Sequence, residues 1–234
     1  MKQARPMALT PALVAQVHRA LEDPGPEAHL VYHADEDYDA LVAELLASHP
    51  GGPETWLFAY GSLIWKPEIE HVETRRGTAR GWHRAFCFRV TRFRGTKEQP
   101  GLMMSLDRGG QCQGVLFRLP SENLEAQLRR LVRREITAKP PNNLPRWIAV
   151  ETEQGALRAI AFVMNRRSRV YVGRLAPEEV ASTLAVACGH WGSGAEYLLN
   201  TVAHLEEHGI HDRHLWTLQR LVADRIASAR AVGA

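Results

Sequence analysis

One carboxylate stands where the sequence pattern predicts an apolar side chain. Between residues 121 and 136, Leu124, Leu128 and Leu131 fall at helical spacing and form one apolar stripe. Glu135 follows Leu131 by four positions and therefore continues that stripe. The helix is expected to direct this carboxylate toward the core. Its basic residues are expected on the other side: Arg129, Arg130, Arg133 and Arg134.

A carboxylate in that position has consequences for its chemistry. Burying a charge costs several kcal/mol unless a partner compensates for it. Desolvation also raises the pKa of a carboxyl group toward neutrality, which suits a general acid/base. Two structural explanations remain open for Glu135: it pairs with a buried arginine, or the helix end frays and water reaches the carboxylate.

A glycine-containing turn is the second candidate for chemistry. It follows the apolar run 56–60, which is typical of a buried strand. Gly61 permits a sharp turn and a close approach of a ligand to the backbone. Successive amide groups in such a turn bind carboxylates and oxyanions, although an ordinary strand-ending turn gives the same pattern. The binding candidates are Tyr60, Gly61, Ser62, Leu63 and Ile64.

Other reactive residue types are placed less favourably. Ser62 lacks a Gly-x-Ser-x-Gly elbow, which disfavours a nucleophilic role. The histidines within 204–214 form no His-Glu-x-x-His motif, so a solvated helix end is favoured over a zinc site. We therefore expect no metal and no organic cofactor. Tyr171 either lines a pocket or is a buried structural tyrosine.

The segments that carry these candidates lie among predicted helices and strands. An N-terminal helix is expected to begin at Pro11 behind a Thr10 cap and to include Leu21, and a second covers 35–48. Turn residues predict hairpins around 107–110 and around Gln154-Gly155. The expected strands are 56–60, 72–79, 84–93, 102–106, 113–119, 147–152 and 157–164.

The last third of the chain is predicted to be helical. Pro177 opens a helix that Gly189 closes. Ser193 and Glu196 have the spacing of a capping box, and Asp212 caps a final helix. Together with the strands, these helices predict an α+β fold in which helices surround a curled or barrel-like sheet.

Length and composition limit the classes of protein. The 234 residues suit one sizeable domain, with a helical extension over 1–53 and the main domain over 54–234. The net charge of +3 and the scattered basic residues argue against nucleic-acid binding. No apolar run is long enough for a membrane span, and no secretory signal is evident. Three cysteines without close spacing favour a reducing, cytoplasmic location, and we expect a monomer.

An ordered set of motifs resembles the ChaC-type γ-glutamylcyclotransferases. The set opens with Phe-Ala-Tyr-Gly-Ser-Leu-Ile-Trp-Lys-Pro at 58–67 and includes Arg-Arg-Glu at 133–135. The remaining similar segments are 81–87, 101–110, 171–173 and 196–201. The resemblance implies a mixed β-barrel fold over 54–234, a γ-glutamyl site at the glycine turn and a catalytic role for Glu135. It also implies cleavage of glutathione into 5-oxoproline and Cys-Gly.

Alternatives to this function remain open. The segment 136–145 departs from the shorter loop expected of the family, which leaves peptide selectivity undetermined. The alternatives are a cyclotransferase acting on other γ-glutamyl amines or amino acids, and a binding or regulatory protein without catalysis on the same fold.

Overall fold

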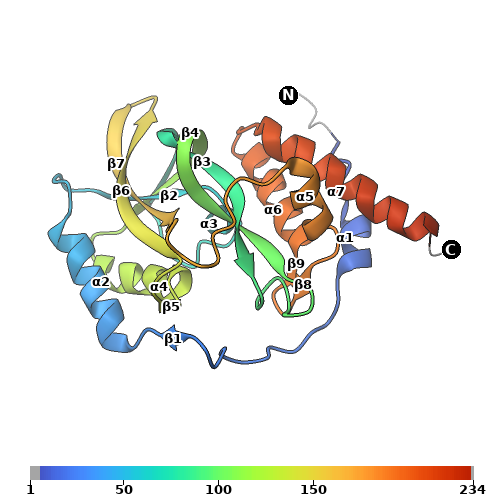
Figure 1. Cartoon of the computed structure of the whole chain (residues 1–234). Coiled ribbons are helices and arrows are strands. Elements are labelled where there is room, and N and C mark those ends of the chain that lie inside the picture. The colour runs from blue at the N-terminus through green and yellow to red at the C-terminus, as the bar shows by residue number, and fades with distance from the viewer. Residues whose placement is uncertain (1–5, 233–234) are drawn as a thin grey trace. The chain divides into compact units, whose positions relative to one another are not determined.

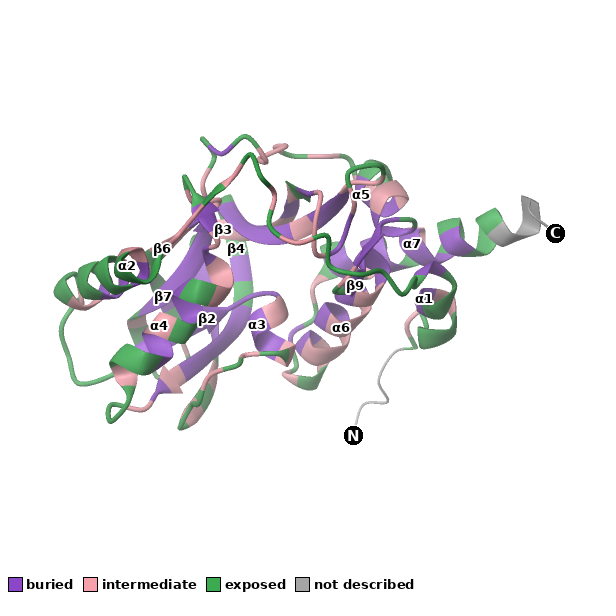
Figure 2. Ribbon diagram, turned by 90° about the horizontal axis from the view of Figure 1, so that it is seen from below, coloured by how far each residue is buried: buried purple, intermediate pink, exposed green. Residues whose placement is uncertain are grey.

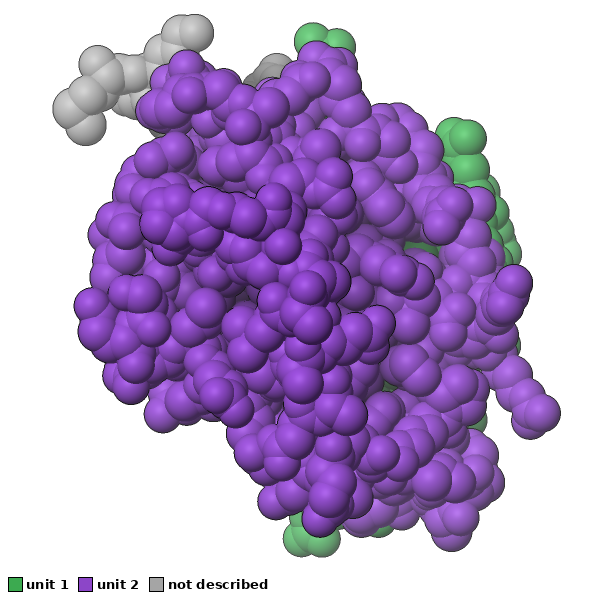
Figure 3. Space-filling view, turned by 90° about the vertical axis from the view of Figure 1, so that its left-hand side faces the viewer, with its two compact units in different colours: residues 1–25, 86–104, 172–234 green, residues 26–85, 105–171 purple. Residues whose placement is uncertain are grey.

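The computed structural model describes residues 6–232, and of residues 230–232 only the backbone (Figure 1). The chain forms two compact units (Figure 3). Unit 1 comprises the described residues of 1–25, 86–104 and 172–234, and unit 2 comprises 26–85 and 105–171. Within the described range, no helix is long and apolar enough to cross a membrane. The proposed division at residue 53 stays a prediction.

A closed barrel of five strands confirms the predicted α+β architecture. The order around the barrel is β2, β4, β3, β6 and β7. Strand β7 closes it by pairing in parallel with β2, at Leu57 and Ile160, and with β4, at Leu106 and Val163. The strands are β2 (Thr55–Ala59), β3 (Glu73–Val90), β4 (Gly101–Leu119), β6 (Asn143–Thr152) and β7 (Gly155–Met164).

Strand β2 lies at the centre of the barrel's packing. All five of its residues are buried, which explains its unbroken apolar sequence (Figure 2). It pairs antiparallel with β4, from Thr55 opposite Leu119 to Ala59 opposite Val115. Because β2 is fixed on both sides, the turn that begins at Tyr60 starts from a rigid position.

The predicted hairpin around residues 107–110 is wrong. Residues 101–119 form the single strand β4, and residues 73–90 form the single strand β3, where two strands were expected. Gly109 and Gly110 take positive φ values of 104° and 68° inside β4. The strand continues through both glycines, so they do not reverse the chain. A ring nitrogen of His83 on β3 lies 3.0 Å from the Gly109 carbonyl oxygen.

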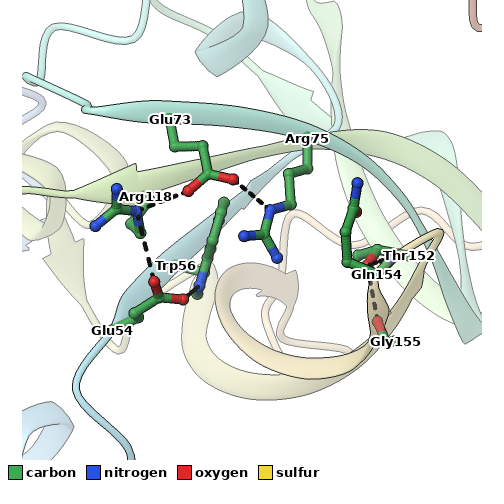
Figure 4. A network of polar contacts seen from close by, with 8 residues as sticks. All are labelled: Glu54, Trp56, Glu73, Arg75, Arg118, Thr152, Gln154 and Gly155. Atoms are coloured by element: carbon green, nitrogen blue, oxygen red, sulfur yellow. Dashed lines mark hydrogen bonds and ion pairs between the residues drawn. The ribbon is translucent and has the colours of Figure 1, made fainter.

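The predicted hairpin around Gln154-Gly155 is confirmed. Strands β6 and β7 pair antiparallel over their whole length, ending with Thr152 opposite Gly155. The Thr152 hydroxyl donates to the Gly155 carbonyl at 2.8 Å and accepts from the Gln154 amide at 3.1 Å (Figure 4).

A polar network ties β2, β3 and β4 together (Figure 4). The carboxylate of Glu73 accepts from Arg75 at 2.6 Å and from Arg118 at 3.0 Å. Trp56 donates from its indole nitrogen to Glu54 at 3.0 Å, while the Arg75 guanidinium lies 4.4 Å from the Trp56 ring centroid. A charge-assisted hydrogen bond thus joins β3 to β4, and the cation–π contact and a 3.8 Å ion pair between Glu54 and Arg118 attach the segment of β2.

Two helices of unit 2 pack together and position the candidate carboxylate. They are α2 (Asp35–Ala47) and α4 (Leu124–Glu135). Ion pairs join them, between Asp39 and Arg129 and between Asp35 and Arg133. The segment after α4 is also held, because β5 (Ala138–Lys139) pairs with β1 (Val31–Tyr32).

Unit 1 contains the remaining long helices, whose predicted N-caps are largely confirmed. Thr10 accepts from the Leu13 amide at 3.3 Å, and Asp212 accepts from the Leu215 amide at 3.0 Å. The elements are α1 (Pro11–Val17), α5 (Pro177–Leu184), α6 (Gly194–Glu207) and α7 (Arg213–Val232), with the short strands β8 (Cys188–Gly189) and β9 (Gly192–Ser193).

Three details of the helical predictions are wrong. Helix α1 ends at Val17, so Leu21 lies outside it. Helix α5 ends at Leu184, five residues before the predicted end at Gly189. Gly189 instead pairs with Gly192 in a small antiparallel sheet. The capping box at α6 is only half formed: Ser193 accepts from the Glu196 amide, but the Glu196 carboxylate pairs with Arg94.

Candidate functional site

Helix α4 directs Glu135 into the protein, as the apolar stripe predicted. Leu128 and Leu131 are each 1% exposed and Val132 is fully buried. Glu135 is the last residue of the helix, and only 15% of its side chain is exposed. The end of the helix is therefore not frayed into solvent, which removes one of the two structural explanations.

The other structural explanation is realised through an arginine that was predicted to face solvent. The Nε atom of Arg134 lies 3.0 Å from Oε1 of Glu135, and only 15% of each side chain is exposed. The prediction for Arg134 was wrong. Helical spacing determines the direction in which a side chain leaves the helix, but not where the end of a side chain as long as arginine lies. The other three arginines, Arg129, Arg130 and Arg133, are more exposed, as expected.

The same guanidinium group reaches the glycine turn. Nη2 of Arg134 donates to the Ser62 hydroxyl at 3.4 Å, and Nη1 donates to the Lys66 carbonyl. Nη1 also lies 3.4 Å from a carboxylate oxygen of Glu68. A planar guanidinium presents several donors in a fixed geometry, so one side chain can hold these groups together. Arg134 thus joins the candidate carboxylate to the candidate binding turn.

Burial raises the pKa of Glu135 above the usual range of a glutamate. The positive charge and hydrogen bond of Arg134 oppose this shift, and the nearby negative charge of Glu68 adds to it. The position of Glu135 at the C-terminal end of α4 also raises its pKa, because the helix dipole disfavours a negative charge there. The result is a carboxylate that releases and accepts a proton more readily near neutral pH than an exposed glutamate does.

The residues of the glycine turn are anchored by their side chains. The Tyr60 hydroxyl donates to the Phe162 carbonyl of β7 at 2.6 Å. Leu63 and Ile64 are buried at 4% and 6% exposure. Gly61 immediately precedes the short helix α3 (Ser62–Trp65). The anchored side chains leave the backbone and the Ser62 hydroxyl as the groups of this turn best placed to meet a ligand.

Tyr171 lies in a second polar cluster around Asp107. The Tyr171 hydroxyl donates to Asp107 at 2.9 Å, and Nε of Arg166 donates to the same carboxylate at 2.6 Å. Burial by itself would raise the pKa of Asp107, but the hydrogen bonds from Arg166, the Arg108 amide and Tyr171 outweigh it and hold the pKa below its usual range. A contact between Tyr171 and substrate stays a prediction.

The histidines near the end of α6 have local partners. A ring nitrogen of His204 lies 2.7 Å from the Asn200 carbonyl, and a ring nitrogen of His211 lies 2.7 Å from Glu206. Among the described residues, no group of three or more histidine, cysteine, aspartate or glutamate side chains is arranged to hold a metal ion.

Sequence reasoning missed Arg134, Lys66 and Glu68 as members of this site. Lys66 and Arg134 lie within motifs that carry the family resemblance, at 58–67 and 133–135, and Glu68 follows the first motif by one residue. Their position in or next to these motifs was the one indication in the sequence that they belong to the site. The missing information was the fold, which places the segment after the glycine turn beside the last turn of α4.

This geometry accords with the comparison to known sequences. Residues 55–225 match the family described as ChaC-like protein, so the chain belongs to that family. The match includes every residue of the site described above.

Relatives from other organisms align with most of this chain. It is 38% identical over 187 residues to an Escherichia coli protein named glutathione-specific gamma-glutamylcyclotransferase, and the alignment covers 80% of each chain. It is 34% identical to the mouse glutathione-specific gamma-glutamylcyclotransferase 1, over 70% of this chain and 77% of the mouse protein.

A solved structure confirms the fold. The crystal structure of a yeast gamma-glutamyl cyclotransferase specific to glutathione superimposes with a TM-score of 0.66 at 20% sequence identity. The superposition covers 74% of this chain and 97% of the yeast chain.

The Asp107 cluster leads to a prediction about stability. Tyr171→Phe removes one donor to a buried carboxylate, so we expect the free energy of unfolding to fall by about 1–3 kcal/mol at neutral pH. The pKa of Asp107 should be higher in the variant than in the wild type. The difference in the free energy of unfolding between the two proteins should therefore narrow as the pH falls through these pKa values. Chemical denaturation at several pH values measures both effects. Tyr32→Phe is the control, because the Tyr32 hydroxyl accepts from the backbone amide of Glu27 at 2.7 Å and is not a donor to a carboxylate there. An unchanged free energy of unfolding in Tyr171→Phe would contradict the structural role.

Proposed function

We propose that this protein is a γ-glutamylcyclotransferase that cleaves glutathione into 5-oxoproline and Cys-Gly, with Glu135 as the general acid/base. The observation that carries the proposal is the pair formed by a largely buried carboxylate of raised pKa and the glycine turn, joined through Arg134. The names of the relatives support glutathione as the substrate.

The reaction needs no nucleophile from the protein. The α-amine of a γ-glutamyl group reaches its own γ-carbonyl carbon and closes a five-membered ring. Intramolecular attack of this kind removes up to about 7–11 kcal/mol from the barrier when the groups are well oriented. The main task of the protein is therefore to fold the glutamyl group and to move protons, which fits a site without a paired serine or cysteine nucleophile.

Glu135 performs the first proton transfer. The ionised carboxylate removes a proton from the substrate α-ammonium, and the freed amine forms a C–N bond with the γ-carbonyl carbon. The carbonyl oxygen takes the electron pair and becomes an oxyanion. A carboxylate of raised pKa is a stronger base than an exposed glutamate, so the transfer is easier.

The protonated Glu135 then completes the reaction. The oxyanion collapses, the bond between the γ-carbonyl carbon and the cysteine nitrogen breaks, and Glu135 donates its proton to the departing amine. The ring nitrogen gives up its second proton to the released amine, which leaves as an ammonium. The products are 5-oxoproline and Cys-Gly, and the carboxylate returns to its starting state. No water is consumed, so closure of the site against solvent favours the reaction.

The glycine turn is proposed to hold the glutamyl group. Tyr60, Leu63 and Ile64 fix the turn by their packing, while Gly61 and Ser62 offer backbone and hydroxyl groups to the substrate. Arg134 contacts both the Ser62 hydroxyl and the Glu135 carboxylate and so fixes their relative positions. Turnover by such an arrangement depends on position, since a displacement of about 1 Å costs a large part of the rate.

The proposed cellular location rests on the state of the cysteines. All three cysteines are buried thiols outside any disulfide bond, which supports the proposed cytoplasmic location. The monomeric state stays a prediction of the sequence.

Glu135→Gln tests the proposed function directly. The amide keeps the shape of the side chain and cannot accept the proton, so we expect kcat with glutathione to fall by about 100-fold or more. Mass spectrometry quantifies 5-oxoproline and Cys-Gly, which the wild type should release in equimolar amounts. The control is Glu125→Gln, an exposed carboxylate on the same helix, which should retain wild-type turnover.

Three results would change the proposal. Near-normal turnover by Glu135→Gln would refute the role of this carboxylate. Turnover of γ-Glu-Ala without turnover of glutathione would keep the mechanism and change the substrate. The absence of turnover with either compound would favour a binding or regulatory protein.

Arg134→Gln should shift the pH dependence of the reaction. Arg134 lowers the pKa of Glu135, so its loss raises that pKa, and Glu68 without its arginine partner adds to the rise. Lys66, which pairs with Glu68 at 3.0 Å, partly offsets this addition. Because the base must be ionised, the acidic limb of the profile of kcat/KM against pH should move to higher pH.

The control for this substitution is Arg129→Gln on the same helix, where the arginine pairs with Asp39 and does not touch the site. A merely structural role for Arg134 would lower activity equally at all pH values. An unshifted profile in Arg134→Gln would therefore contradict the positioning role.

A further inference from the structure

A cavity of about 380 Å³ lies between α4 and the segment that follows the glycine turn and α3. One wall is the segment 67–69, and the other is a row of helix residues: Arg130, Leu131, Arg133 and Arg134. Glu135 is not part of the lining, so the cavity is separate from the site proposed for the γ-glutamyl group. Its volume is in the range of small-molecule binding sites.

The wall formed by the segment 67–69 is attached to α4 at both of its ends. At the near end, Arg134 donates to the carbonyl oxygen of Lys66. At the far end, the backbone amide of Glu70 donates to the side-chain oxygen of Gln127 at 3.2 Å, and Gln127 is only 2% exposed. The two walls therefore hold each other in place without a ligand, which lowers the entropic cost of binding one.

The arginines of α4 leave one positive charge in the cavity uncompensated. Like charges three or four residues apart on a helix repel each other, and Arg130 stands in that relation to Arg133 and Arg134. Arg133 is paired with Asp35, and Arg134 is paired with two carboxylates of the site. Arg130 is exposed and makes no hydrogen bond or ion pair with any residue that the structure describes. The positions three and four before it, at 126–127, are alanine and glutamine and supply no counter-charge.

The single carboxylate in the lining does not neutralise Arg130. Glu68 lies 3.0 Å from the Lys66 ammonium and 3.4 Å from Nη1 of Arg134. Its backbone has a φ of 55°, in the left-handed region that residues other than glycine seldom adopt. Such conformations are concentrated at ligand sites and switch regions, where the surrounding structure holds them in place. An anion from outside the chain is therefore the group that the cavity lacks.

The arrangement of donors favours a phosphate group as that anion. Guanidinium groups bind phosphate oxygens through parallel, charge-assisted hydrogen bonds. A phosphate presents oxygens in several directions, so it can face Arg130 and still meet the positive charge of Arg133 and Arg134. The apolar side chains of Pro67, Ile69 and Leu131 complete the lining and suit an organic group attached to the phosphate.

We propose that this cavity is a second binding site, which takes a phosphate group, either inorganic phosphate or the phosphate monoester of a small molecule. Arg130 is its principal ligand, and Arg133 and Arg134 add positive charge around it. Phosphate binding here is independent of the proposed γ-glutamyl chemistry and goes beyond it.

Arg134 couples the two sites, because it lines the cavity and its Nε lies 3.0 Å from Oε1 of Glu135. The charges that act on Glu135 are those of Arg134 and Glu68, and Lys66 pairs with Glu68. A bound phosphate adds negative charge beside Arg134 and so disfavours ionisation of Glu135, which raises the pKa of that carboxyl group. Filling the cavity should therefore move the acidic limb of kcat/KM to higher pH, a consequence that rests on the proposed function.

Isothermal titration calorimetry of the full chain measures binding without turnover. The probes are inorganic phosphate and phenyl phosphate, each in chloride buffer at constant ionic strength. We expect wild type to bind one equivalent of phosphate, and Arg130→Gln to bind it about tenfold or more weakly, as for loss of a charged hydrogen bond. The probe that binds wild type more tightly identifies the source of the phosphate group, since only phenyl phosphate has an apolar part for the lining.

Three further variants separate this site from its surroundings. Arg146→Gln is the matched control, because Arg146 is an exposed arginine of β6 outside the cavity and has no partner among the described residues. It removes the same charge and should bind phosphate as wild type does. Arg130→Lys keeps the charge and should recover part of the lost affinity. Glu135→Gln saturated with glutathione should still bind phosphate, because the two ligands occupy different sites.

The results that would overturn the phosphate site are specific. One is the absence of saturable phosphate binding by wild type, and another is equal affinity in Arg130→Gln and Arg146→Gln. Displacement of phosphate by glutathione from Glu135→Gln would place the anion in the substrate site and would overturn it as well. The absence of glutathione turnover by wild type would instead refute the proposed function and leave phosphate binding through Arg130 standing.

Discussion

The contact between Arg134 and Glu135 is the interaction on which the site depends. One guanidinium group serves two carboxylates, Glu135 and Glu68, and also holds the Ser62 hydroxyl and the Lys66 carbonyl. It keeps a buried negative charge tolerable and fixes the distance between the carboxylate and the glycine turn. Without a partner, a buried carboxylate would be protonated or would draw water into the core.

The rest of unit 2 can be understood as the support for that contact. The buried strand β2 fixes the start of the glycine turn, and Tyr60 anchors it to β7. Ion pairs from α2 hold α4 at Arg129 and Arg133, on the side away from Glu135. Because both partners of the contact are held by rigid elements, the carboxylate is positioned without a ligand, as its proposed role in catalysis would require.

The sequence predicted what depends on periodicity and local chemistry. The stripe ending in Glu135, the buried run before Gly61, the cap at Asp212 and the hairpin at Gly155 were all recoverable on these grounds. The unbroken course of β4 through Gly109 was not, because a glycine pair with turn chemistry predicts a chain reversal as readily as a continuous strand. The inward course of Arg134 was not recoverable either, since it depends on Ser62 and Glu68, which only the fold places beside the helix.

The most direct test of this account is the pKa of the Glu135 carboxyl group. It can be measured by 13C NMR titration of side-chain carboxyl resonances, with Glu135→Gln identifying the signal. The account predicts a midpoint clearly above the value of about 4.3 for an unperturbed glutamate. A midpoint at or below that value would show that Arg134 and solvent outweigh burial, and would contradict a carboxylate tuned for acid/base chemistry.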